Sequence, residues 1–229
     1  MSTLLHHLLL ALAVLALGQA ALRIAARAGA TGLARFVAAV VIGVGIAVTQ
    51  ALALGLVGLG ANPLALSLAA AVTWAGVTAL LPGASPAGSA GAELAAWWRG
   101  LDRVGRLATA AGGGACAAWL VWQLSEPSIG FDSSLYHYPF VAGWIENGSP
   151  GSGLELSYDI PYNSYPLTDE VALTWGAGIA RSWVPLSLWN PFTLAMLAAG
   201  IWLTLRNLSV ARLPAGLAVG VLATQPLIV

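Results

Sequence analysis

The sequence predicts an all-α protein that crosses a membrane several times, and three observations lead to this prediction. Hydrophobic residues make up 59% of the chain and charged residues only 8%, whereas an ordinary soluble domain has about 25% charged residues. Long apolar stretches recur along the sequence, and the few charged residues fall between them. The formal net charge is zero, which offers no attraction to a polyphosphate. These observations exclude a soluble enzyme, a disordered protein and a nucleic-acid binder.

Six stretches have, or approach, the length needed to cross a bilayer as helices. A hydrocarbon core about 30 Å thick requires roughly 20 apolar residues, because every backbone polar group must be satisfied within the helix. The expected spans run from Leu4 to Leu22, Phe36 to Leu59, Leu64 to Leu81, Leu107 to Leu124, Leu188 to Leu205 and Leu213 to Val229. The last has no polar residues after it, so we expect the N-terminal portion of a longer protein.

The first of these stretches has the length of a signal peptide but lacks its basic start. Arg23 and Arg27 follow the apolar run instead of preceding it, so we interpret it as a retained helix. His6 and His7 at its beginning are interpreted as polar residues at the membrane interface.

The arginines predict the orientation of the spans. Eight of the nine fall in three connections between spans. They are Arg23, Arg27 and Arg35 in the first connection, Arg99, Arg103 and Arg106 in the second, and Arg206 and Arg212 in the third. Because basic residues collect on the cytoplasmic side, these connections are expected in the cytoplasm. The amino terminus, the turn from Gly60 to Pro63 and the long connection after Leu124 are then expected outside.

This long outer loop, residues 125–187, contains seven of the nine acidic residues and all five tyrosines. For the orientation to hold, the weakly apolar run from Asp169 to Leu188 must not cross the membrane. Its tryptophans and Arg181 favour a helix that lies in the membrane interface. The alternative is a seventh span, which would reverse the orientation of the last two helices.

The chain divides into two predicted membrane blocks. Residues 1–82 form a three-helix block with few polar features. Residues 83–106 are expected to form a cytoplasmic linker followed by an amphipathic helix from Glu93 to Arg106. Residues 107–229 form the second block, which contains the outer loop and the candidate functional residues.

The first group of candidate residues lies where the loop leaves the fourth span. Apolar and aromatic residues recur there at helical spacing, at Leu135, Tyr138, Val141 and Ile145. We therefore expect a helix that lies flat on the membrane, with Asp132 just before it and Pro139 at a kink or restart. An Asp in this position is often only an N-cap. The functional alternative is a carboxylate held where a lipid-borne substrate presents its headgroup.

The second group opens the helix expected after residue 166. Thr168 or Asp169 is placed to act as its N-cap, and acidic residues in the first turn complement the helix dipole. Both acidic groups lie in one loop on one side of the membrane, which favours a site that includes Asp169 and Glu170.

Several spaced residues in this loop resemble the GT-C glycosyltransferases. Asp132, Tyr136-His137-Tyr138-Pro139, Trp144-Ile145 and Asn147-Gly148-Ser149 resemble the first outer loop of that family, and Asn163-Ser164-Tyr165-Pro166 with Asp169-Glu170 resembles its later part. The resemblance covers about Leu107 to Val229. Two departures are evident: Asp132-Ser133 stands where the family commonly has Asp-Glu, and family members have many more helices.

The GT-C enzymes, which include protein mannosyltransferases and aminoarabinose transferases, are polytopic and use polyprenyl-phosphate sugars. The resemblance thus implies transfer of a sugar to an acceptor hydroxyl or amine at the extracytoplasmic face. It implies that Asp132 is the base and that Glu170 orients the acceptor or binds a metal ion. Whether a divalent metal is required stays open.

The resemblance also implies that the loop contacts the sugar and the lipid phosphate. Tyr136, His137 and Asp169 are expected to line the substrate site. Arg181 is expected either to meet the lipid phosphate or to extend its charge to the membrane surface without a ligand. The expected partners are membrane lipid and a polyprenyl-phosphate-linked sugar.

A transporter or a non-catalytic membrane subunit is the alternative function. A transport path requires ionisable residues within the spans, and the six predicted spans have essentially none. We therefore expect a multi-pass glycosyltransferase of a bacterial plasma membrane.

Overall fold

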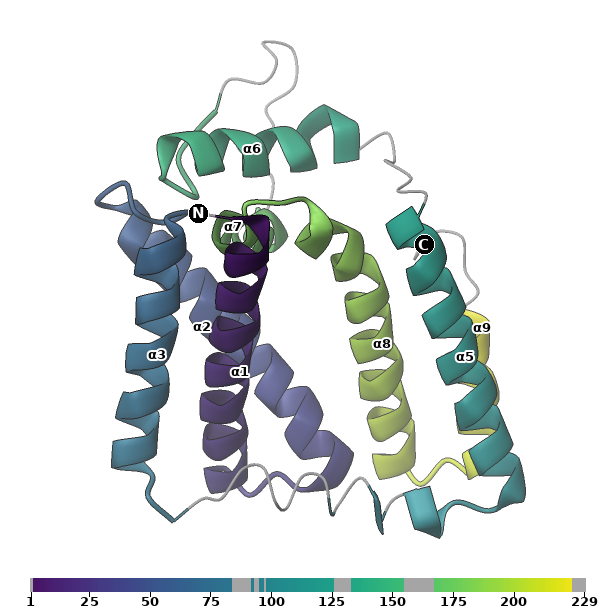
Figure 1. Ribbon diagram of the computed structural model, residues 1–229. Coiled ribbons are helices and arrows are strands. Elements are labelled where there is room, and N and C mark those ends of the chain that lie inside the picture. The colour runs from purple at the N-terminus through teal and green to yellow at the C-terminus, as the bar shows by residue number, and fades with distance from the viewer. Residues whose placement is uncertain are drawn as a thin grey trace.

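The computed structural model describes residues 2–83, 92, 95–96, 98–125, 133–154 and 167–223, and every regular element in these residues is helical (Figure 1). The long helices are α1 (Thr3–Arg27), α2 (Gly32–Gly55), α3 (Pro63–Leu80), α5 (Arg103–Ser125) and α8 (Val184–Asn207). The shorter helices are the π-helix η1 (Ser133–His137), α6 (Tyr138–Asn147), α7 (Thr168–Ala180) and α9 (Arg212–Ala223). The predicted all-α class is confirmed for these residues.

The five long helices each have the length and apolar composition needed to cross a membrane. They correspond to the first five predicted spans, and α9 covers the beginning of the sixth, whose last residues lie outside the described part. Large apolar side chains such as Leu12, Val41 and Leu68 are exposed on these helices. Such a surface is unfavourable in water but suits contact with lipid chains. These features indicate an integral membrane protein.

The long helices run alongside one another and place their connections at two opposite ends (Figure 1). The α1–α2 turn, the start of α5 and the α8–α9 turn lie at one end, which we call the arginine end because its helix termini carry Arg27, Arg103, Arg206 and Arg212. The start of α1, the α2–α3 turn, α6 and α7 lie at the other end, which we call the loop end. The predicted separation of basic and acidic residues therefore corresponds to two ends of the helix bundle.

The predicted amphipathic helix from Glu93 to Arg106 is wrong as a continuous element. Residues 98–100 are helical, but the chain leaves the helix at Leu101 and Asp102, and α5 starts afresh at Arg103. The cause is local: Asp102 Oδ1 accepts a hydrogen bond from the Gly105 backbone N–H at 2.7 Å, as an N-cap residue does. Arg103 and Arg106 consequently belong to the first turn of α5.

The short helix α6 lies across the loop end and continues directly from η1, so the helix does not restart at Pro139. Pro139 lies in the first turn of α6, directly after η1, and its missing N–H removes a backbone hydrogen bond where the π-helical turn passes into the α-helix. The inner face of α6 is fully buried, with Phe140, Val141 and Trp144 in the core. The apolar face that we expected beside the bilayer therefore packs mainly on protein.

The prediction that residues 169–188 form a helix in the lipid interface is also wrong. Helix α7 ends at Ala180, α8 begins only four residues later at Val184, and every residue from Glu170 to Ala180 is buried. Figure 1 shows α7 end-on, crossing the direction of the long helices. The close approach is possible because Gly178 has no Cβ. A Cβ there would lie only 3.0 Å from the Ala61 carbonyl oxygen. Small residues thus place α7 against protein and not lipid.

The segment after α6 docks on the α2–α3 turn. The Gly60 N–H donates to the Gly148 carbonyl at 2.8 Å, and the Ser149 hydroxyl donates to the Gly55 carbonyl at 3.1 Å. Gly148 has φ of 73°, a left-handed backbone suited to glycine at a helix C-terminus. One buried core also joins α1, α2 and α3 to α6 and α7. The first three helices therefore support α6, α7 and the segment after α6 directly.

Candidate functional site

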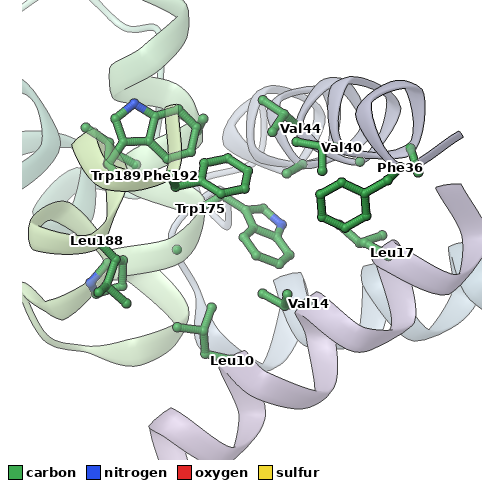
Figure 2. A pocket seen from close by; sticks show the side chains of 18 of the residues that line it. Leu10, Val14, Leu17, Phe36, Val40, Val44, Trp175, Leu188, Trp189 and Phe192 are labelled. Atoms are coloured by element: carbon green, nitrogen blue, oxygen red, sulfur yellow. The ribbon is translucent and has the colours of Figure 1, made fainter. Parts of the chain in front are cut away.

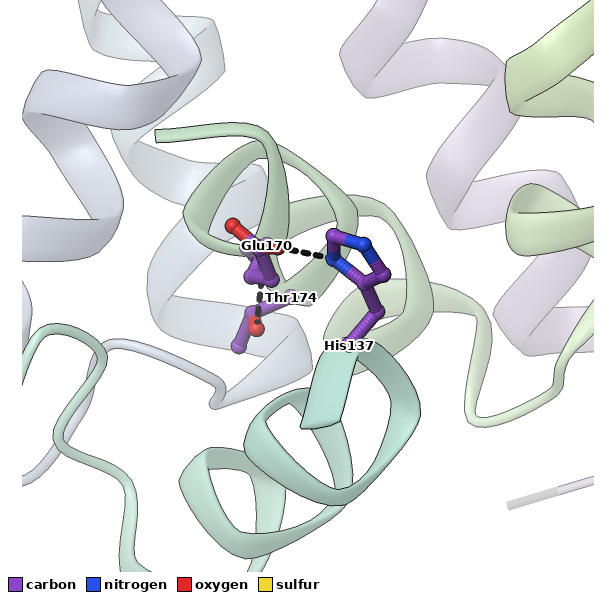
Figure 3. Close-up of polar contacts among 3 residues, drawn as sticks. All are labelled: His137, Glu170 and Thr174. Carbon is purple, nitrogen blue, oxygen red and sulfur yellow. Dashed lines mark hydrogen bonds and ion pairs between the residues drawn. The ribbon is translucent and has the colours of Figure 1, made fainter. Parts of the chain in front are cut away.

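The most distinctive polar contact at the loop end joins His137 and Glu170 (Figure 3). His137 ends η1, and Glu170 lies in the first turn of α7. Their side chains meet through His137 Nδ1 and Glu170 Oε1, with 35% of the His137 side chain exposed and 2% of the Glu170 side chain. An ionised carboxylate can only accept a hydrogen bond, so Nδ1–H is the donor. For a neutral imidazole, this contact favours the tautomer whose Nε2 keeps its lone pair.

The surroundings of Glu170 explain how a carboxylate is held inside the protein. The first turn of a helix presents unpaired N–H groups and a partial positive charge. One turn later, the buried Thr174 hydroxyl donates to the Glu170 backbone carbonyl at 2.7 Å, which satisfies that hydroxyl without contacting the carboxylate. Among the described residues, the second carboxylate oxygen, Oε2, is buried and has no hydrogen-bond partner. The interaction with His137 is thus the main compensation for burying this acid.

Among the described residues, no partner contacts the second ring nitrogen of His137, Nε2, which is therefore available to another molecule. Figure 3 shows the second ring nitrogen on the side of the ring away from Glu170. The Tyr136 ring packs against the imidazole, with 4.0 Å between ring centroids and 39° between planes. An imidazole oriented by a carboxylate, with a free Nε2, is an arrangement that can take a proton from a substrate.

Asp169 adds a third titratable group beside this pair. Its side chain is exposed at the start of α7. Partial desolvation and the neighbouring Glu170 charge raise the pKa of Asp169, while His137 lowers it by a smaller amount. The start of α7 therefore has a local excess of negative charge. No group of three or more His, Cys, Asp or Glu side chains able to hold a metal ion occurs in the described part of the chain.

The structure brings some predicted site residues together and separates others. Tyr136, His137, Asp169 and Glu170 form one group at the start of α7. Arg181 follows the last residue of α7, about 16 Å from Glu170 along the helix axis at 1.5 Å per residue. Arg181 therefore does not belong to this group. Asp132, the predicted base, lies outside the described residues.

A second polar contact at the loop end, between His7 and Ser182, is not predicted by the sequence pattern. His7 Nδ1 lies 2.8 Å from the Thr3 carbonyl, and His7 Nε2 lies 3.1 Å from the Ser182 hydroxyl. A carbonyl only accepts, so Nδ1 carries the proton and the Ser182 hydroxyl donates to Nε2. The contact ties the start of α1 to the turn between α7 and α8. Because 175 positions separate the two residues, no local pattern could have indicated their contact.

A buried polar chain crosses the interior beneath α7. The Trp175 indole N–H donates to Gln50 Oε1 at 3.1 Å, and Gln50 Nε2 donates to the Thr73 hydroxyl at 2.9 Å. These residues come from α7, α2 and α3. Polar side chains that bond across helices hold bundles together inside membranes, so this chain helps to fix α7 in place.

An apolar groove of about 390 Å³ lies between α1, α2, α7 and α8 (Figure 2). Its walls are almost wholly hydrocarbon and aromatic, and they include Leu10, Val14, Phe36, Trp175, Leu188 and Phe192. Helix α7 therefore carries Glu170 at its start and contributes to the wall of the groove further along.

No family model, curated protein or solved structure matches the chain. The functional inference therefore depends on the site geometry and on the spaced residues of the outer loop.

Proposed function

We propose that the protein is a membrane glycosyltransferase that moves a sugar from a polyprenyl-phosphate donor to an acceptor hydroxyl or amine. The observation that carries this proposal is the contact between His137 and the buried Glu170 at the loop end of the long apolar helices. A lipid-linked donor keeps its headgroup at the membrane surface, so the reacting groups of such an enzyme belong at the ends of its helices.

The chemistry requires one base and one good leaving group. The acceptor oxygen or nitrogen attacks the sugar carbon that is bonded to the donor phosphate, the bond from that carbon to the phosphate oxygen breaks, and the acceptor proton goes to a base. Polyprenyl phosphate departs as a stable anion, so no general acid is needed. Of the described residues, His137 is the best base because its Nε2 is free and Glu170 stabilises the imidazolium that forms. Asp132 remains a second candidate base by resemblance.

The distribution of charges supports surface chemistry over transport. From Phe36 to Leu81 the chain has no Asp, Glu, Lys or Arg, whereas transport paths contain ionisable groups within the spans. The proposed acid–base pair instead lies in elements that cover the end of the bundle.

Transfer from a labelled sugar donor tests the proposal. The full-length protein is assayed in membranes with polyprenyl-phosphate hexose and pentose donors, and transferred label is measured over a range of pH. We expect His137→Ala to lower the rate by about 10²- to 10⁴-fold, the usual contribution of a general base. Glu170→Gln should lower the rate and change its pH profile, because the imidazolium loses its negative partner. Wild-type rates in both variants would refute the assignment of the base.

A further inference from the structure

Arg181 is the one arginine of the nine that does not lie at the arginine end. The chain has no other Arg or Lys between Arg106 and Arg206. Arg181 is exposed, and no hydrogen bond or ion pair joins it to another side chain in the described residues. Its backbone has φ of 49°, a left-handed conformation that usually favours glycine at the end of a helix. A long cationic side chain therefore occupies a position whose backbone conformation favours glycine.

A serine and an exposed tryptophan follow Arg181 in the chain. Ser182 follows Arg181 and contacts His7 at 3.1 Å. Trp183 comes next and is 54% exposed. Exposed tryptophans collect at the headgroup level of a bilayer. The α7–α8 turn therefore has the features of a protein surface at the level of lipid headgroups.

This polar turn lies in the chain between two groove-lining residues, Gly176 at one side and Pro185 at the other. Leu10, one helical turn after His7, and Pro185, three residues after Ser182, both line the groove. The groove volume of about 390 Å³ falls within the range of about 300–1,000 Å³ found for small-molecule sites. The turn thus offers a cation, Arg181, while the groove walls are almost wholly hydrocarbon and aromatic.

We propose that this groove binds an anionic membrane phospholipid, with an acyl chain between α1, α2 and α8 and the headgroup phosphate at Arg181. The nearest acids along α7, Asp169 and Glu170, lie at the opposite end of that helix, so no carboxylate on α7 opposes a negative headgroup. The positive charge of Arg181 favours an anionic headgroup over a zwitterionic one. This site is separate from the His137–Glu170 pair and does not depend on glycosyl transfer.

Lipid retention tests the headgroup assignment. The full chain is reconstituted in nanodiscs with equal amounts of phosphatidylglycerol and phosphatidylcholine, and retained lipid is measured by native mass spectrometry. We expect preferential retention of phosphatidylglycerol and a loss of about tenfold in that preference in Arg181→Gln, the usual scale for a charge-assisted contact. Arg212→Gln, at the arginine end, is the matched control and should leave the preference unchanged.

A second pair of variants tests the acyl-chain part of the site. Gly18 lines the groove, and a Cβ at this position would have no other heavy atom within 4 Å. We expect Gly18→Phe to fill the groove and abolish tight lipid retention. Gly112→Phe on α5, where a Cβ also has open space, is outside the groove lining and should retain lipid normally.

Several results would overturn the proposal. Equal retention of the two phospholipids by the wild type would exclude headgroup selection. An unchanged preference in Arg181→Gln would exclude Arg181, and normal retention in Gly18→Phe would exclude the groove. Displacement of phosphatidylglycerol by added polyprenyl phosphate at equal concentration would assign the groove to a donor lipid instead.

Discussion

His137 Nδ1 lies against the carboxylate of Glu170, so two side chains 33 positions apart form a partly buried polar contact at the loop end. One partner belongs to a π-helix and the other to the first turn of a buried α-helix. π-helical turns are rare and occur often at functional sites. The contact therefore connects the outer segment to the core through the group that we propose as the base.

Removing the carboxylate should destabilise the protein more than neutralising it. In Glu170→Ala the Nδ1–H loses its acceptor and a buried space opens, so we expect a loss of roughly 2–4 kcal/mol. In Glu170→Gln the amide oxygen can still accept, so the loss should be smaller. Thermal unfolding in detergent measures both effects. Thr193→Ala, at an exposed position on α8, serves as a control, and an equal melting temperature for Glu170→Ala and wild type would contradict the assigned role.

The pKa of Asp169 predicts a pH dependence of stability. Because this pKa is raised in the folded protein from its ordinary value of 3.8, the folded state binds the proton more tightly than the unfolded state. The contribution of Asp169 is therefore most favourable below its ordinary pKa and becomes unfavourable as pH rises through the raised value. We expect Asp169→Asn to be more stable than wild type near neutral pH and to lose this advantage in acid. Melting curves from about pH 3 to about pH 7 measure the difference, and a constant difference would contradict the prediction.

The Gln50–Trp175 hydrogen bond should stabilise the position of α7. Trp175→Phe removes the indole donor and leaves Gln50 Oε1 without it, so we expect a loss of about 1 kcal/mol beyond the packing change. A double-mutant cycle with Gln50→Leu isolates the hydrogen bond from the packing. Denaturant unfolding measures the four proteins, and strictly additive effects would show that the two residues are not coupled.

The close approach of α7 to the α2–α3 turn should make Gly178 sensitive to substitution. A Cβ at Gly178 would lie 3.0 Å from the Ala61 carbonyl oxygen and 3.1 Å from its Cα, and backbone atoms cannot rotate away. We expect Gly178→Ala to cost about 1–3 kcal/mol. In the matched control Gly76→Ala, the Cβ would have no such neighbour within 4 Å, so this variant should gain about 0.5–1 kcal/mol in helix stability. Equal unfolding free energies for the two variants would argue against the close contact.

The long helices could be predicted closely from the sequence because membrane spans obey a local rule. Each span must satisfy its own backbone hydrogen bonds, so a long apolar run is enough to indicate a helix. The start of α3 also depends on a local interaction, because the Asn62 side chain caps it by accepting hydrogen bonds from the Leu64 and Ala65 N–H groups. Pro139 marks the junction of η1 and α6 for an equally local reason.

The candidate site could be predicted only in part. The sequence indicates both Glu170 and His137 as site residues, but with separate roles. Residue spacing shows which face of a helix a residue occupies, and it does not show which faces meet. Arg181 was grouped with them because it lies in the same loop, whereas the length of α7 holds it at the opposite end.

The sequence by itself therefore determined the helices, the separation of basic from acidic ends and the residues available for chemistry. These properties depend on neighbouring residues and on the cost of exposing polar groups to lipid. Only the tertiary structure decided that α7 is buried, that His137 meets Glu170 and that His7 meets Ser182. Those contacts depend on the close approach that Gly178 permits against Ala61 and on segments far apart in the chain sharing one core.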